Sequence, residues 1–125
     1  MSFKLPSFSK SKVSYQEFTK GLETFLWTDL SDTSEIGRGT FGAVLLASFK
    51  SEQKTAAEKV VVKKLLQSSR SDEKQRFFKE ARLLQSLNHK NVAKFKKVCI
   101  EPPAIMMEFV AFDFKFFCSE IMNLF

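Results

Sequence analysis

Three glycines in the first half of the chain form the first group of residues that could do chemistry. They stand in the string Gly37-Arg-Gly39-Thr-Phe-Gly42, which has the spacing GxGxxG. Glycine has no Cβ, so backbone N–H groups at such positions can approach phosphate oxygens closely. The string therefore predicts a nucleotide phosphate site, although several nucleotide-binding folds share this spacing and the neighbouring elements must decide between them.

A lysine farther along could supply the cation that phosphates require. Lys63 follows Val60-Val61-Val62, a β-branched run that favours a strand ending at Lys63 or Lys64. Side chains alternate along a strand, so Val61 and Lys63 point to one face and Lys64 points to the other, toward solvent. We therefore expect Val61 and Lys63 to face a nucleotide beneath the glycine-rich turn.

A glutamate on the following helix could hold that lysine in place. Glu80 shares a helical stripe with Phe77 and Leu84, so its carboxylate lies on the face that should pack inward. A buried charge is costly unless it has a partner of opposite sign. We expect Glu80 to pair with Lys63; the alternative is that Glu80 is a charge at the rim of the helix.

These groups require a sheet with one main helix to position them. The sequence predicts a β-hairpin over 33–49, a third strand from Val60, a helix over 72–87 and two strands over 92–100 and 104–110, in the order β-β-β-α-β-β. Asp72 is the expected N-cap, with Gln75 three residues on. A dinucleotide site would need a helix directly after the glycines. Ala43 to Ala47 predicts a strand there, which excludes that class of site.

The strings GRGTFGAV, VVVKKL, FFKEARLLQSLNHKNV and IMMEFV, in that order and at these separations, resemble the N-terminal lobe of a eukaryotic protein kinase. The resemblance covers residues 30–112 and implies an α+β fold, a five-stranded antiparallel sheet with one main helix. It implies ATP as the ligand, and transfer of the γ-phosphate of ATP to a protein hydroxyl in full-length relatives. Val92 to Cys99 further resembles the tyrosine-kinase and tyrosine-kinase-like groups.

The resemblance also implies roles for individual residues. The glycine-rich loop would cover the phosphates, Lys63 would contact them, and Glu80 would be the partner of Lys63. Met107 would be the gatekeeper, a role compatible with that of a plain core residue, and Glu108 to Val110 the hinge that binds adenine through backbone groups. The residues assigned to nucleotide binding are Gly37, Arg38, Gly39, Thr40, Phe41, Gly42, Val44, Val61, Lys63, Glu80, Met107, Glu108 and Val110.

The sequence departs from the family pattern in two ways. At Val61 the family usually has alanine, and the extra methyl groups narrow the space for adenine. No string in the chain resembles the HRD, DFG or APE segments, which supply the catalytic aspartate and the Mg²⁺ ligands. We therefore assign no catalytic residue and no metal ligand, expect Mg²⁺ only through the ATP phosphates, and predict that this chain alone is inactive. The alternative is a non-catalytic, pseudokinase-like protein-interaction module.

The chain divides into three parts by its patterns. Residues 1–29 are expected to form an extension outside the domain, partly disordered or with a short helix over 15–30 that uses Trp27 as an anchor. Residues 30–112 form the predicted kinase lobe, without the second lobe of the family. Residues 113–125 are a strongly apolar tail, which would fold back on the lobe or be covered by a protein partner.

Composition narrows the class of protein. A chain of 125 residues suffices for one small domain, and its net charge of +6 keeps nucleic acid as a third alternative. Lysines cluster over 90–97, but Phe95 is the only aromatic residue among them, so we do not expect nucleic-acid binding.

Cys99 and Cys118 are expected to be reduced thiols and, with His89 as the only histidine, to form no zinc site. No stretch is apolar enough to span a membrane; the expected location is cytoplasmic, with nuclear as the alternative.

Overall fold

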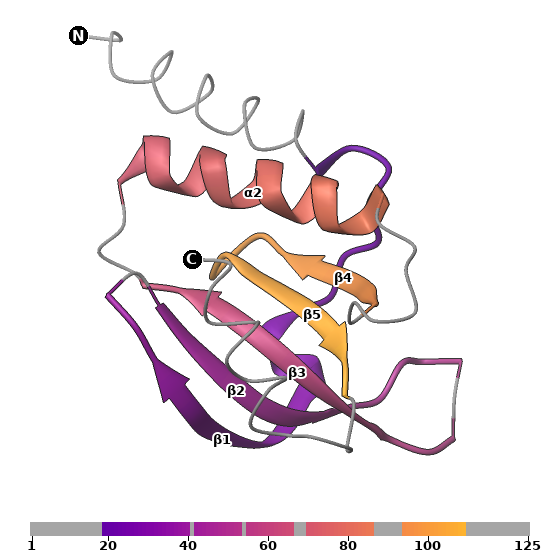
Figure 1. Ribbon diagram of the computed structural model, residues 1–125. Helices are drawn as coiled ribbons and strands as arrows, with labels where there is room; N and C mark the ends of the chain where they lie inside the picture. The colour runs from indigo at the N-terminus through magenta and orange to yellow at the C-terminus, as the bar shows by residue number, and fades with distance from the viewer. Residues whose placement is uncertain (1–18, 41, 54, 67–69, 87–93, 110–125) are drawn as a thin grey trace, which may run out of the picture.

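A computed structural model describes residues 19–40, 42–53, 55–66, 70–86 and 94–109. Five antiparallel strands form one sheet in the order β1-β2-β3-β5-β4, and the helix α2 lies across one face of it (Figure 1). The elements are η1 (Trp27–Asp29), β1 (Leu30–Arg38), β2 (Gly42–Phe49), β3 (Glu58–Leu65), α2 (Ser71–Ser86), β4 (Phe95–Cys99) and β5 (Ala104–Glu108). The predicted α+β class and the order β-β-β-α-β-β are confirmed. No helix within the described ranges is long and apolar enough to cross a membrane.

The first strand is longer and less regular than the sequence predicts. β1 begins at Leu30 rather than at residue 33, and its register against β2 shifts between Ser31 and Ser34 and again between Glu35 and Gly37. At the first shift Asp32 has a φ of 51°, in the left-handed region that aspartate tolerates better than most residues. β1 stands at one edge of the sheet, so these irregularities bend it without disturbing the central strands.

The helix α2 begins one residue earlier than the sequence predicts. The C=O of Arg70 accepts the N–H of Lys74 at 3.0 Å, so Arg70 is the N-cap and Asp72 lies inside the first turn. The predicted cap at Asp72 is wrong because Glu73, three residues after Arg70, accepts the Arg70 backbone N–H at 2.9 Å. The Asp72 carboxylate instead pairs with the Arg70 guanidinium at 3.3 Å. Leu87, the predicted last residue of the helix, lies outside the described residues.

Two apolar clusters stabilise the sheet, one on each face. The helix-side cluster lies between the sheet and α2 and consists of Leu22, Val44, Val61, Leu65, Phe77, Phe78, Ala81, Leu84, Val98, Ile105 and Met107. The far-side cluster consists of Phe25, Ala47, Phe49, Val60, Val62, Cys99, Ala104 and Met106. Alternation along β3 explains the division, because Val61 and Leu65 point to the helix side whereas Val60 and Val62 point to the far side.

The residues from Lys20 to the start of β1 are bound to the sheet and do not form the predicted helix. Thr19 is helical, and from Lys20 the backbone makes a turn, pairs with β4 and then forms η1. Leu22 enters the helix-side cluster and Phe25 enters the far-side cluster. The helix predicted over 15–30 is therefore wrong from Lys20 onward, because the apolar side chains of Leu22 and Phe25 reach opposite faces as the chain crosses the edge of the sheet. Residues 15–18 lie outside the described residues.

Trp27 anchors this segment on the far side of the sheet. Its side chain is half-buried against the far-side cluster, and Lys64 Nζ lies 5.2 Å from the centroid of its ring. Lys64 thus points to the opposite face from Lys63, as predicted. Its ammonium lies over the indole of Trp27, whereas the prediction placed it in solvent. The contact is a cation–π interaction, which is strongest with tryptophan.

Candidate nucleotide site

The glycine-rich string forms the end of the β1–β2 hairpin. The N–H of Gly39 donates to the C=O of Gly42 at 2.8 Å, which closes the turn, and Gly37 stands opposite Val44. β2 begins at Gly42, so a strand follows the glycines where a dinucleotide site would need a helix. Phe41, the predicted tip of the loop, lies outside the described residues.

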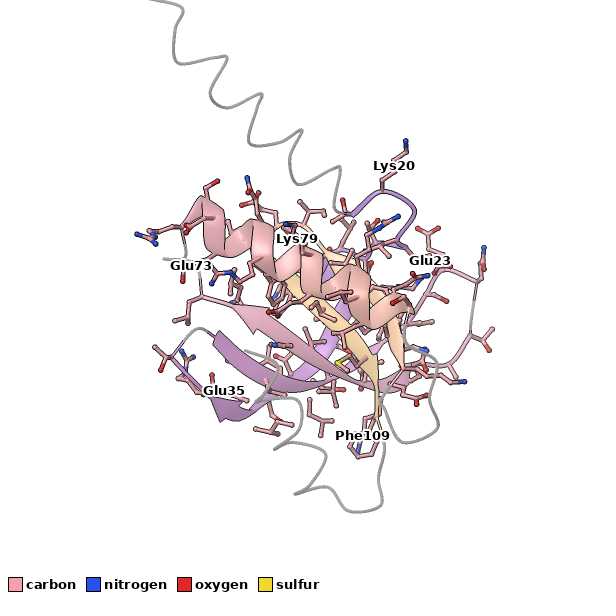
Figure 2. All side chains as sticks on the ribbon, turned by 45° about the horizontal axis from the view of Figure 1, so that its top comes forward. Lys20, Glu23, Glu35, Glu73, Lys79 and Phe109 are labelled. Atoms are coloured by element: carbon pink, nitrogen blue, oxygen red, sulfur yellow. The ribbon has the colours of Figure 1, made fainter. Side chains whose placement is uncertain are left out.

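Arg38 and Thr40 flank this turn and are both exposed. Arg38 Nη2 lies 2.6 Å from Glu35 Oε1, and the hydrogen bond and charge of Glu35 raise the pKa of Arg38. Glu35 lies on β1, at the end of the sheet where the hairpin turns (Figure 2). A phosphate that used the Arg38 guanidinium would therefore compete with a carboxylate of the same strand.

Lys63 lies on β3, at the centre of the sheet, on the helix side. The register places it opposite Val44 of β2 and Ile105 of β5. Its side chain is 0% exposed. Burial lowers the pKa of Lys63 to about 8, and the charge of Glu80 opposes that shift in part. The ammonium is still the main form at neutral pH, so Lys63 can serve as a cation toward a phosphate.

Glu80, on α2, lies close enough to Lys63 for their charges to interact. Glu80 is half-buried; burial raises its pKa, while the charges of Lys63 and then Arg76 lower it. For both members of the pair the cost of burial outweighs the attraction, since each pKa moves toward the neutral form. A pair of this kind adds little to stability. The coupling favours the predicted partnership over a rim charge at the helix edge.

The side chains expected to contact adenine come together on the helix side. Val61 stands opposite Met107 in the β3–β5 register, and both belong to the helix-side cluster with Val44. Val44 and Val61 are 0% exposed and Met107 is 2% exposed. The three residues are therefore core residues in this structure, and an adenine ring would reach them only after the atoms that cover them move.

The end of β5, where the hinge is expected, is fixed by contacts with Lys94 and Lys59. The N–H of Glu108 donates to the C=O of Lys94 at 2.9 Å, and the Glu108 carboxylate accepts the N–H of Lys94 at 3.3 Å. Phe109, at the tip of β5 in Figure 2, lies beneath Lys59 Nζ, which is 5.2 Å from its ring centroid. Val110 lies outside the described residues.

Two cations beside the site are not among the predicted residues. Arg76 precedes Glu80 by four positions on α2, and this spacing is a signal that the sequence does show. Lys59 precedes Lys63 by four positions on β3, but its aromatic partner Phe109 is distant in sequence and leaves no local signal. Across the described residues, no group of three or more His, Cys, Asp or Glu side chains could hold a metal ion.

Comparisons with known proteins agree on one family. The family model of protein tyrosine and serine/threonine kinases matches residues 30–113. The chain is 42% identical over 82 residues to serine/threonine-protein kinase LMTK3 of Mus musculus, across 64% of this chain and 6% of that protein. It is 42% identical over 78 residues to spermatocyte protein spe-8 of Caenorhabditis elegans, across 60% of this chain and 15% of that protein.

A third relative is the inactive tyrosine-protein kinase 7 of Gallus gallus. The chain is 31% identical to it over 104 residues, which make up 82% of this chain and 10% of that protein. The chain thus spans between 6% and 15% of the length of these three relatives.

Proposed function

This chain belongs to the protein tyrosine and serine/threonine kinase family, and from that membership we propose that it binds ATP on the helix side of the sheet, beneath the β1–β2 hairpin. Active members of the family are phosphotransferases that move the γ-phosphate of ATP to a protein hydroxyl. The relatives of this chain include a serine/threonine kinase and an inactive tyrosine kinase. Membership of the family is therefore compatible with an active or an inactive protein.

In this proposal each group of residues has a separate role in binding ATP. Backbone groups of Gly37 to Gly42 cover the phosphates, with Arg38 and Thr40 at the mouth of the loop. Lys63 contacts the phosphates while Glu80 holds the lysine in place. The apolar surface for adenine comes from Val44, Val61 and Met107, and the backbone of Glu108 and Val110 would hydrogen-bond its edge. ATP would bring Mg²⁺ on its own phosphates.

The observation that carries the proposal is the buried ammonium of Lys63 beside a carboxylate. The sheet places this cation on the same face as Val44 and opposite it in register, one strand from the glycine-rich turn. Its environment lowers the pKa of Lys63, so the charge is kept at a cost in folding free energy. A triphosphate would reduce that cost because it supplies compensating negative charge.

The test is the thermal stability of the purified protein during titration with ATP, with and without Mg²⁺. We expect a saturable rise in Tm for the wild type and a much smaller one for Lys63→Ala. Lys64→Ala is the matched control, because Lys64 is the neighbouring lysine on the opposite face. No rise in Tm for a folded wild type, or the same rise in Lys63→Ala, would rule the proposed site out.

We also propose that this chain alone transfers no phosphate. Phosphoryl transfer needs a base for the substrate hydroxyl and carboxylate ligands for Mg²⁺, and the sequence offers no string that resembles the segments supplying them. Incubation with ATP, Mg²⁺ and a generic protein substrate should give no phosphorylation. Magnesium-dependent phosphorylation that disappears in Lys63→Met would overturn this part of the proposal.

A second candidate function is a non-catalytic interaction module. The complete burial of Val44 and Val61 favours it, since an adenine pocket needs access to these side chains. A partner that covers the apolar residues 113–125 would belong to this candidate. A folded protein that shows no ATP-dependent change in Tm but retains a protein partner would support it over the first.

A further inference from the structure

The side of α2 that points away from the sheet is basic. The apolar side of the helix is buried in the helix-side cluster, which leaves the opposite side in contact with solvent. From Arg76 to the end of the helix, the exposed residues are Arg76, Lys79, Arg82, Leu83, Gln85 and Ser86. This set contains cations, neutral polar side chains and a leucine, but no carboxylate.

The spacing of these residues makes them one continuous surface. Arg76, Lys79 and Leu83 are three and four positions apart, so they follow one another along one side of the helix. Arg82 lies beside them, three positions after Lys79. The side chain of Leu83 is 66% exposed. A large apolar side chain therefore stands in water among cations.

A further cation reaches this surface from the turn before β1. The Arg82 guanidinium donates a hydrogen bond to the C=O of Lys20, so the backbone of this turn lies against the helix. The Lys20 side chain is exposed. Lys20 and Lys79 both lie toward the top of Figure 2, on the side of the sheet that α2 covers. We call Lys20, Arg76, Lys79, Arg82 and Leu83 the basic face.

Carboxylates close to the basic face are bound to other cations. Asp72 and Glu73, in the first turn of α2, lie 3.3 Å and 3.8 Å from nitrogen atoms of the Arg70 guanidinium. The Glu23 carboxylate lies 2.5 Å from Lys97 Nζ. The hydrogen bond and charge of Lys97 lower the pKa of Glu23, so this carboxylate is ionised and held at β4.

Glu80 is the remaining carboxylate of α2. It is half-buried, and its charge interacts with Lys63 first and with Arg76 second. Glu80 thus offsets only part of the positive charge on the outer side of the helix. Like charges that are held close together repel one another, and an anionic surface placed against them would reduce that repulsion.

The combination of cations with an exposed leucine favours a membrane as that anionic surface. A peptide ligand would need a groove or a free strand edge, whereas the outer side of a helix is convex. Nucleic-acid phosphates would use the cations but would leave Leu83 in water. An anionic bilayer uses both, because its headgroups attract Lys and Arg while an apolar side chain enters the boundary with the acyl chains.

We propose that the basic face docks this lobe on an anionic phospholipid membrane, with α2 parallel to the bilayer surface. The sheet lies on the other side of the helix and faces away from the lipid. The inference does not rest on nucleotide binding, because no residue of the basic face is assigned a contact with ATP. Each cation near such a surface contributes about fivefold to the affinity.

The first experiment measures co-sedimentation of the purified protein with vesicles made of equal parts phosphatidylserine and phosphatidylcholine. The double variant Arg76→Gln/Lys79→Gln should bind about 25-fold more weakly than wild type. The matched control is Lys50→Gln/Lys94→Gln, which removes the same charge at two exposed lysines outside α2. This control should keep most of the wild-type binding, and binding of the wild type should weaken as the salt concentration rises.

The second experiment tests the apolar part of the basic face on the same vesicles. Leu83→Ser should lower the bound fraction because it removes the side chain that enters the bilayer. Leu26→Ser is the control, since Leu26 is 68% exposed and lies outside the basic face. Both variants should unfold at nearly the wild-type temperature, because both side chains are already in water.

Several results would overturn the inference. One is a wild type that does not bind the phosphatidylserine vesicles, or that binds vesicles of phosphatidylcholine alone equally well, as an apolar tail would. Equal losses in the two double variants would assign the binding to net charge and not to the basic face. Loss of duplex DNA binding in Arg76→Gln/Lys79→Gln, with vesicle binding unchanged, would identify nucleic acid as the partner instead.

Discussion

The ammonium group of Lys63 is buried in the folded protein, where its charge is stabilised less well than it would be in water. Burial lowers its pKa to about 8, although the carboxylate of Glu80 is near enough to oppose the shift. The same burial raises the pKa of Glu80. Burial therefore moves the pKa of each group toward its neutral form, and changes in solvation or in the position of α2 would shift both pKa values.

The stability of the protein should depend on pH in a window set by this residue. The pKa of Lys63 is about 8 in the folded chain and 10.5 when unperturbed, so the unfolded state binds more protons between these values. The free energy of unfolding should accordingly rise by about 3 kcal/mol as the pH increases through the window. Urea denaturation of wild type and Lys63→Met across that range measures the difference. An equal pH dependence in both proteins would contradict the buried ammonium.

Val61 should limit the affinity for ATP through its size. Val61→Ala removes two methyl groups from the helix-side face, so we expect tighter ATP binding together with a loss of about 2 kcal/mol in stability. Val62→Ala, the same change at the next position and on the opposite face, should cost similar stability and leave ATP affinity unchanged. Titration calorimetry gives the affinities and urea denaturation the stabilities. Equal affinities in the two variants would show that Val61 does not face the nucleotide.

At the scale of the elements, α2 depends on its first turn. Arg70 offers no side-chain oxygen to the helix, so the carboxylate of Glu73 completes the cap by accepting the Arg70 N–H at 2.9 Å. The glutamate also lies 3.8 Å from the Arg70 guanidinium. Because this end of the helix precedes Glu80 by two turns, fraying there would reach the site only through the helix itself.

Glu73→Ala should therefore destabilise the protein more than Asp72→Ala does. We expect a loss of about 1 kcal/mol for Glu73→Ala and a much smaller loss for Asp72→Ala, whose carboxylate makes only an exposed ion pair. Thermal unfolding followed by circular dichroism measures both. A larger loss for Asp72→Ala would restore the cap that the sequence predicts.

The sequence predicts most elements because their signals are local. The β-branched run at Val60-Val61-Val62 marks β3, and the glycine spacing marks the β1–β2 turn. The stripe of Phe77 and Leu84 marks the buried face of α2, on which Glu80 also lies. These patterns also predict the face that Lys63 shares with Val61, because alternation along a strand needs no long-range information.

The parts that the sequence does not predict depend on partners distant along the chain. Leu22 and Phe25 have helical spacing in the sequence. The neighbouring residues do not indicate that this backbone pairs with Val98, and that pairing keeps it extended. The complete burial of Val44 and Val61 likewise depends on what packs over the sheet. Hydrophobic periodicity predicts which side chains are buried, but it does not predict which part of the chain packs over them.

At the scale of the whole molecule, the folded unit extends ahead of the residues that match the family. Phe25 is 5% exposed and meets Phe49 edge to face, with ring centroids 6.2 Å apart. The neighbouring Leu26 is 68% exposed. The residues just before β1 thus contribute to the core of the sheet, and a boundary placed at residue 30 would cut through it.

Phe25→Ala should consequently destabilise the protein by about 3 kcal/mol, because it leaves a cavity in the far-side cluster and removes an aromatic contact. Leu26→Ala, the adjacent residue, should change stability by less than about 0.5 kcal/mol, since its side chain is already in water. Urea denaturation of the two variants tests the difference. Similar values for both would place this segment outside the folded unit.

The two edges of the sheet meet solvent differently, and this affects how copies of the molecule associate. The backbone of residues 23–25 lies along β4, whereas β1 forms the other edge and is bent by the left-handed Asp32 and its two register shifts. A strand from a second molecule needs a flat row of backbone donors and acceptors to extend a sheet, and β1 offers only short regular stretches with exposed polar side chains. The irregular strand thereby hinders edge-to-edge aggregation, and a variant that straightened it would be expected to form fibrous assemblies more readily.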